Sequence, residues 1–312
     1  MNKHKTTEEF ISSFFIILPT IFTLLALFIF TYPLNSTITN LLPIPIFTGL
    51  IILIFGSFYK KQKTASKLRM AGWIIFTGYW ATQPQTLYWA EQQDLINALL
   101  CIIGIYVLFY IAYREWYSYR INKYEPSLQW IAGASAIAGL IYFLFELTPL
   151  APYLIDSIAV QSGWLLNIFT GEVTINPPFL YYKLANIRII FACTAVQSMV
   201  IFIGMILPLP NVEPKRKIKG LLITVVPVYF LNLIRNAGIT YLVGIYGPSF
   251  FSIAHNYIGK GGSLIALIVL LLIVTKIVPE VFDNIIELTD LPKNDGPLEK
   301  QFKKIFGRSK GK

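Results

Sequence analysis

The sequence predicts an all-α polytopic membrane protein, built as a bundle of about eight transmembrane helices. Of its 312 residues, 55% are hydrophobic and only 13% are charged, whereas soluble globular domains carry about 25% charged residues. The mean hydropathy is +0.61, and the apolar residues occur in runs near the roughly 20 residues that a helix needs to cross hydrocarbon. A soluble fold is excluded, because so few charges cannot cover a water-exposed surface.

Eight apolar runs follow one another along the chain. Each is expected to be helical, because only helices and closed barrels satisfy their backbone in lipid, and the runs lack the two-residue alternation of a barrel strand. The first run is too long for a cleaved signal peptide, and Gln83, Pro84 and Gln85 interrupt the third. The predicted spans are Phe10 to Phe30, Leu41 to Tyr59, Met70 to Ala90, Leu95 to Tyr113, Trp130 to Thr148, Ile187 to Leu207, Gly220 to Leu242 and Gly262 to Val278.

The distribution of cations predicts the orientation. Of the 26 Lys and Arg residues, 22 fall on one side of an eight-span path, among them Arg69 and Arg114 in predicted connections. Cytoplasmic loops collect Lys and Arg, so both termini are expected in the cytoplasm. The net charge of +10 then reports topology, and no nucleic-acid partner is expected. We expect a transmembrane domain over residues 1–279 and a basic cytoplasmic tail over residues 280–312.

The opposite, extracellular side has few cations and one long connection, Pro149 to Asn186. Within it, Asp156 to Phe169 has the apolar spacing of a helix lying on the outer surface of the membrane. Four cations on this side or in the outer part of a span need a local explanation: Lys183, Arg188, Arg235 and Lys260.

Three reactive side chains are predicted to converge near the extracellular face. Cys193 is six residues into its predicted span, and Arg235 is seven residues before the outer end of the next one, so both lie about 10 Å below the outer boundary at 1.5 Å per residue. His255 precedes the last span and can reach the same level from outside. A nucleophile, a cation and a base would thus meet on one side of the membrane.

Each of these side chains also has a structural interpretation. An arginine within a span is costly and by default faces a protein interior or a wet cavity, but Arg235 could instead pair with Glu146 or Asp156. A buried cysteine is usually an inert small hydrophobe, and Cys101, which has no polar neighbour on its own helix, keeps that interpretation. His255 could be an interfacial residue that is bonded to a backbone carbonyl.

Polar neighbours of these residues are candidates for substrate binding. Gln197 follows Cys193 at i+4, and Asn232 and Asn236 flank Arg235. The sequence has only two histidines, so no histidine-rich metal site is expected. Nucleotide-binding, zinc-protease and serine-hydrolase motifs are absent from the sequence, and no cofactor is expected.

Three segments together resemble the exosortase/archaeosortase family. They are Ala192-Cys-Thr-Ala-Val-Gln-Ser198, Asn232-Leu-Ile-Arg-Asn236 and Ser252-Ile-Ala-His-Asn256. The archaeosortase A branch is the most similar, and the resemblance covers roughly residues 187 to 297. It implies that residues 187–279 carry the catalytic spans.

The resemblance implies a cysteine protease and transpeptidase at the outer face of an archaeal cell membrane. In this family a cysteine attacks the C-terminal sorting signal of an exported surface protein, and an arginine and a third residue, Arg or His, complete the site. Carried onto this chain, these are Cys193, Arg235 and His255. Substrates would carry a Pro-Gly-Phe type motif, a transmembrane helix and a basic tail, and a membrane lipid would accept the cleaved protein.

Two other classes of protein remain as alternatives. In a transporter or channel, Arg235 would bind an anionic substrate near the outer gate, and replacement of Cys193 would be tolerated. In a non-catalytic assembly protein, replacement of either residue would have a mild effect. Lys260 is a reserve candidate for the cation or the base.

Overall fold

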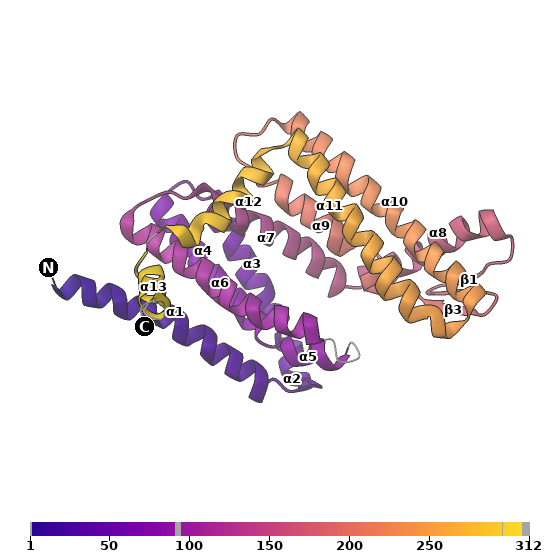
Figure 1. Ribbon diagram of the computed structural model, residues 1–312, viewed down its shortest axis with the longest axis horizontal. Coiled ribbons are helices and arrows are strands. Elements are labelled where there is room, and N and C mark those ends of the chain that lie inside the picture. Colours follow the sequence, from indigo (N-terminus) through magenta and orange to yellow (C-terminus); the bar gives the residue numbers. More distant parts are fainter. Residues whose placement is uncertain (1, 91–94, 295, 308–312) are drawn as a thin grey trace. The chain divides into compact units, whose positions relative to one another are not determined.

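The computed structural model describes residues 2–90, 95–294 and 296–307, and most of them are helical (Figure 1). The α-helices are α1 (Asn2–Phe28), α2 (Ser36–Leu41), α3 (Pro43–Phe58), α4 (Gln62–Trp80), α5 (Pro84–Ala90), α6 (Leu95–Ile121), α7 (Pro126–Glu146), α8 (Leu150–Thr170), α9 (Val196–Ile206), α10 (Pro214–Tyr246), α11 (Lys260–Ile277), α12 (Glu280–Asp290) and α13 (Pro297–Gly307). Contacts divide the chain into two compact units. One contains Met1–Ala136 and Asn284–Lys312, and the other contains Ile137–Asp283.

Five of the predicted spans are confirmed as helices that are long and apolar enough to cross a membrane. In the described part of the chain these helices are Ser36–Phe58, Leu95–Ile121, Pro126–Glu146, Pro214–Tyr246 and Pro248–Ile277. The first predicted span forms most of α1, but its apolar part, Ser12–Phe28, is shorter. The protein is a largely helical, polytopic membrane protein, and the predicted count of eight spans is not reached among the described residues.

The third predicted span, Met70 to Ala90, is wrong as a continuous helix. Helix α4 ends at Trp80, and α5 begins only at Pro84. Proline favours the first helical position, where no N–H is needed, and it disfavours a helical backbone in the residue before it. The Thr82 hydroxyl also donates a hydrogen bond of 2.7 Å to the Tyr79 carbonyl, so a side chain satisfies this carbonyl at the end of α4.

The sixth predicted span, Ile187 to Leu207, is wrong in its first half, and with it the expectation of an all-helical chain. The structure has a three-stranded antiparallel sheet in the order β1 (Thr174–Asn176), β2 (Phe179–Tyr182) and β3 (Ala185–Arg188). Burial alternates along β3, with Ala185 and Ile187 buried and Asn186 and Arg188 exposed. This two-residue period is that of a strand with one covered face.

In the first unit, α4 packs between α3 and α6, and glycines allow α3 and α4 to approach closely. A Cβ atom added to Gly49 would lie 2.9 Å from the backbone nitrogen of Phe76, and one on Gly72 would lie 3.0 Å from the Gly49 carbonyl oxygen. Neither contact leaves room for a side chain, so both glycines are required by the packing of these two helices.

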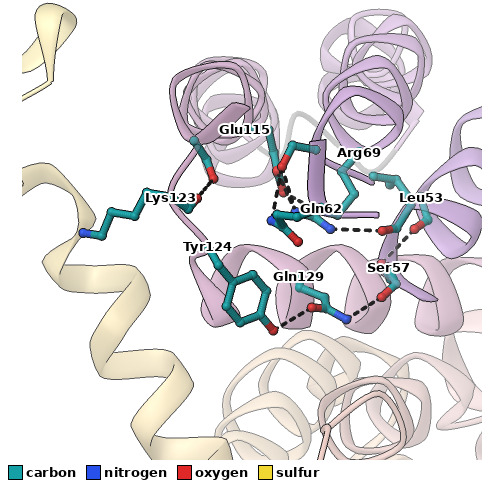
Figure 2. A network of polar contacts seen from close by, with 11 residues as sticks. Leu53, Ser57, Gln62, Arg69, Glu115, Lys123, Tyr124 and Gln129 are labelled. Atoms are coloured by element: carbon teal, nitrogen blue, oxygen red, sulfur yellow. Dashed lines mark hydrogen bonds and ion pairs between the residues drawn. The ribbon is translucent and has the colours of Figure 1, made fainter. Parts of the chain in front are cut away.

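Arg69, which the sequence placed in a cytoplasmic connection, is instead buried in α4. Its guanidinium donates hydrogen bonds of 2.6 and 3.0 Å to the Glu115 carboxylate and one of 3.0 Å to the Gly56 carbonyl (Figure 2). Both charged side chains are at most 1% exposed. The expectation of a loop cation was wrong because a carboxylate on α6 neutralises this arginine inside the bundle.

Arg114 was also expected in a connection and is likewise buried. It donates hydrogen bonds of 2.8 Å to Glu125 and 3.2 Å to Glu299. The hydroxyls of Tyr110 and Tyr113 donate to the two carboxylate oxygens of Glu299, at 2.7 and 2.9 Å. Because Glu299 lies on α13, this cluster fixes the C-terminal helix against α6. In the described part of residues 280–312, which were predicted to be a cytoplasmic tail, the chain forms α12 and α13, and α13 has a buried anchor.

In the second unit, α10 is the central element. Helices α8, α9 and α11 and the sheet all contact it, and α11 runs beside it for much of its length (Figure 1). The hairpin of β2 and β3 packs tightly on its last turns, where a Cβ atom on Gly244 would lie 2.7 Å from the Tyr182 carbonyl oxygen. The helix predicted over Asp156 to Phe169 is confirmed as part of α8.

Candidate active site

Cys193 lies in an irregular segment, residues 189–195, which we call the cysteine loop. The loop leaves the sheet with a hydrogen bond of 2.9 Å from the Ile189 amide to the Pro178 carbonyl. It then forms one 3-10 turn, Phe191–Cys193, and Ala195 takes a left-handed backbone conformation with φ of 61° before α9 starts at Val196. Cys193 therefore precedes the helix that was expected to contain it, and it is partly exposed.

Two buried asparagines of α10 hold the cysteine loop. The side-chain amides of Asn232 and Asn236 donate hydrogen bonds of 2.8 and 3.0 Å to the carbonyl oxygen of Cys193. The two asparagines are one helical turn apart and so project from the same side of the helix. Arg235 lies between them in sequence. The structure thus brings Cys193 to the level of Arg235 along α10. The prediction had placed Cys193 there by counting residues along a helix, but that helix begins only after Cys193.

Arg235 lines a groove of about 340 Å³ between α10 and the helix that contains His255. The opposite wall includes Ile258, Gly259 and Gly262. Hydrogen bonds and ion pairs identified among the described residues do not involve the Arg235 guanidinium, and its Nε atom is buried. The proposed pairing of Arg235 with Glu146 or Asp156 is not found, and Glu146 instead accepts a hydrogen bond from Tyr142. Arg235 is therefore a cation with unused donors that faces a groove.

His255 was expected to precede the last span. The structure instead places it inside a continuous helical segment, Pro248–Ile277. The segment contains a 3-10 turn (Pro248–Phe250, η2), a π-helical stretch (Ile253–Gly259, η3) and then α11. π-Helical turns are rare in proteins, and those that occur are often found at functional sites. The half-buried imidazole stacks on Phe251, with ring centroids 5.2 Å apart and planes 12° apart. Arg235 and Lys260 are close enough to His255 to interact with it electrostatically.

The other predicted residues of this region have separate positions. Gln197 is exposed in the first turn of α9 and shares no helix face with Cys193, because Ala195 breaks the helix between them. Two of the four cations that needed a local explanation have aromatic neighbours in the sheet. Lys183 lies 5.4 Å from the centre of the ring of Tyr182, and Arg188 lies 5.9 Å from that of Phe179, directly across the β2–β3 ladder.

The inert interpretation of Cys101 agrees with its surroundings. It is 1% exposed, and its thiol donates a hydrogen bond of 3.4 Å to the Trp80 carbonyl. Cys193 and Cys101 thus differ in exposure as well as in their polar neighbours. In the described part of the chain, no group of three His, Cys, Asp or Glu residues is arranged to hold a metal ion.

Sequence reasoning missed two features near the cysteine loop. The Tyr229 hydroxyl donates a hydrogen bond to Gln161 of α8, which joins α8 to α10 on the face that carries Asn232. A Cβ atom on Gly259 would lie 3.1 Å from Arg235 Nε. Tyr229 precedes Asn232 by three residues and Asn236 by seven, a polar spacing within an apolar run that could have revealed the first feature. The second depends on tertiary contacts alone.

Comparison with known proteins assigns the chain to a family. Residues 46–274 match the sequence model of the family described as transmembrane exosortase, which is most of the chain. The protein belongs to the transmembrane exosortase family. It is similar to archaeosortase A of Haloferax volcanii, with 24% identity over 71% of this chain and 83% of the relative. It is 23% identical to archaeosortase A of Natronomonas pharaonis over 81% of this chain and 89% of that relative. No solved structure matches it significantly.

Proposed function

We propose that this protein is a membrane-embedded cysteine transpeptidase that cleaves the C-terminal sorting signal of exported surface proteins. Its substrates carry a short Pro-Gly-Phe type motif, a transmembrane helix and a basic tail, and a membrane lipid accepts the cleaved product. The observation that carries the proposal is the attachment of Cys193 to α10 beside Arg235, whose guanidinium is unpaired and faces a groove. Membership of the exosortase family supports it.

In the first half of the reaction, the Cys193 thiolate attacks the carbonyl carbon of the scissile peptide bond. The C=O electrons move to oxygen, and the resulting oxyanion is stabilised by the Arg235 guanidinium. A well-placed donor of this kind contributes about 3–4 kcal/mol to the transition state. Collapse of the oxyanion breaks the C–N bond and leaves an acyl thioester on Cys193.

His255 moves the protons of both halves. It first donates a proton to the leaving amine, which departs with the transmembrane helix and basic tail of the substrate. The neutral imidazole then takes a proton from the incoming hydroxyl group of the acceptor lipid. That oxygen attacks the thioester carbonyl, forms the new ester bond and expels the Cys193 thiolate. Water in place of the lipid would give hydrolysis through the same intermediate.

We propose an extracellular site with both termini in the cytoplasm. Without the buried Arg69 and Arg114, 20 of the 26 cations remain on the predicted cytoplasmic side, which supports this orientation. The positions of Lys183, Arg188, Arg235 and Lys260 in the second unit then belong to the extracellular end. Cysteine labelling with reagents that do not cross membranes tests this topology.

A transporter or channel is the second candidate, and the unpaired guanidinium of Arg235 is the observation that favours it. An anion entering the groove would meet unused N–H donors at Arg235. In that case replacement of Arg235 abolishes flux, while replacement of Cys193 has little effect. The transpeptidase requires both residues.

The deciding experiment compares the two cysteines. In cells, Cys193→Ala is expected to abolish processing of a surface protein that carries a C-terminal sorting signal, and Cys101→Ala at a matched expression level is expected to retain it. A thioester between Cys193 and a substrate fragment, trapped by acid quenching and identified by mass spectrometry, would establish the intermediate. Normal processing by Cys193→Ala would refute the proposed function.

A further inference from the structure

We infer that Asn232 and Asn236 form a positioning pair that fixes the nucleophile, and that their amides act on Cys193 instead of on substrate. The inference deepens the proposed function, because it assigns a role to two residues beside the proposed nucleophile. It starts from two hydrogen bonds of 2.8 and 3.0 Å that end on one atom, the Cys193 carbonyl oxygen. Both asparagines are buried, at 7% and 3% exposure, so neither presents a free surface to a ligand.

The cysteine loop needs this support because its own backbone supplies little. A 3-10 turn ends at Cys193, and the left-handed Ala195 prevents the turn from continuing into α9. The Cys193 carbonyl is therefore without an intrahelical donor. Buried backbone carbonyls are almost always paired, and here the partners come from another helix. The two amides supply the pairing that a continuous helix would have provided.

The remaining hydrogen bonds of the loop do not reach α10, and they include one of 2.8 Å from the Cys193 amide to the Ile190 carbonyl within the loop. The Ile189 amide is bonded to the sheet, and the Thr194 hydroxyl donates 2.7 Å back to the Phe191 carbonyl within the loop itself. The bonds from α10 are thus the ones that tie Cys193 to the helix carrying Arg235. The placement of the sulfur relative to the guanidinium depends on the asparagine pair, since Asn232, Arg235 and Asn236 lie within five residues of one helix.

A carbonyl oxygen has two lone pairs, so both amides can donate at once. Removal of one asparagine leaves the carbonyl paired with the other. Removal of both leaves the partly buried carbonyl without either donor, which costs more than the loss of one bond alone. The effects of the two substitutions on the rate are therefore not expected to multiply in the double variant. Each single change is expected to lower the rate by about three- to tenfold, the effect of one ordinary hydrogen bond, and the double change by more than the product.

The test uses the full-length protein in detergent or vesicles with Asn232→Ala, Asn236→Ala and the double variant. Asn186→Ala is the control, because this exposed asparagine lies on β3 and its side chain is not part of the site. For cleavage of a sorting-signal peptide, the positioning role predicts that kcat falls while KM is unchanged. A rise in KM with constant kcat would mean that the amides bind substrate and would overturn the inference.

A second measurement needs no substrate and separates this inference from the proposed function. In a Cys101→Ala background, cysteine labelled with 13C and 18O at its carbonyl marks residue 193 alone. The labelled amide I band is expected to move to higher wavenumber in each single variant and further in the double variant, as hydrogen bonds are lost. Unchanged bands in folded variants would overturn the inference. Band shifts in a protein that does not process substrate would uphold it and count against the transpeptidase.

Discussion

Arg235 reaches the groove across Gly259, so that a Cβ atom on residue 259 would lie 3.1 Å from Arg235 Nε. The same atom would lie 3.0 Å from a methyl group of Ile239 and 3.1 Å from the Ala254 carbonyl oxygen. A side chain at this position must therefore displace one of three neighbours. Of the two polar neighbours, Arg235 Nε is a buried atom with no hydrogen bond to hold it.

Gly259→Ala is accordingly expected to move Arg235 and to lower processing activity. Overpacking of this kind costs about 1–3 kcal/mol, which corresponds to roughly a five- to 150-fold loss if it falls on the transition state. Gly261→Ala is the matched control, because a Cβ atom there meets open space. Steady-state kinetics of both variants checks the prediction, and equal activity of the two would contradict it.

The two cysteines are expected to react with thiol reagents at different rates. Cys193 is partly exposed, whereas Cys101 is buried and hydrogen-bonded to the Trp80 carbonyl. We expect a membrane-impermeant maleimide to modify Cys193 more than about tenfold faster in intact cells, since thiol reactivity depends on exposure and on the thiolate fraction. Single-cysteine variants followed by mass-shift labelling give the two rates. Similar slow rates would indicate two inert core cysteines.

The ion pair of Arg69 and Glu115 predicts an asymmetric response to substitution. Arg69→Met leaves a buried carboxylate without its partner, and such changes cost about 3–5 kcal/mol. Adding Glu115→Leu removes the unpaired charge, so the double variant is expected to recover most of that loss. Denaturant unfolding in mixed micelles measures the three free energies. A double variant as unstable as Arg69→Met would show that the pair is not coupled.

The pair of Arg216 and Glu280 predicts a pH dependence of stability. Hydrogen bonds of 2.8 and 2.9 Å from Arg216 hold the pKa of Glu280 below its ordinary value. A carboxyl group whose pKa is lower in the folded state stabilises the protein above its unfolded pKa of about 4.3. This contribution is lost as the pH falls through the lowered folded value.

The measurement is the melting temperature between about pH 6 and 3, a range that brackets the ordinary carboxyl pKa. Wild type is expected to lose stability more steeply on acidification than Glu280→Gln, which cannot ionise. Glu287→Gln, at an exposed position of the same helix, is expected to follow wild type. Parallel curves for wild type and Glu280→Gln would show that this salt bridge has no part in acid sensitivity.

Helices were predictable from sequence where one apolar run forms one helix, as in α6, α7 and α10. The prediction failed where an apolar run contains two kinds of structure. Residues 187–190 are as hydrophobic as a span, and hydropathy does not distinguish a covered strand from a buried helix. Ala195 gives no local signal for its left-handed conformation, which is held by the tertiary contacts of the cysteine loop.

The reactive residues of the candidate site could be predicted from the sequence, but the hydrogen bonds that hold them in place could not. Cys193, Arg235 and His255 attract attention because each is unusual within an apolar sequence. Asn232 and Asn236 were expected to contact substrate, and only the structure reveals their bonds to a backbone carbonyl. Likewise, Arg69 and Arg114 resemble loop cations in sequence, because their partners Glu115 and Glu299 are 46 and 185 residues away.

Helix α10, at 33 residues, rises about 50 Å and exceeds the thickness of the hydrocarbon core by about 20 Å. The first two turns of α10 carry Lys215, Arg216, Lys217 and Lys219, and its last turns carry the β-hairpin. Neither charged side chains nor irregular backbone are tolerated among lipid tails, so the surplus length divides between the two ends of the helix. In the proposed orientation Arg235 would then lie just inside the outer edge of the hydrocarbon, and a substrate would have to bring its scissile bond down to that level.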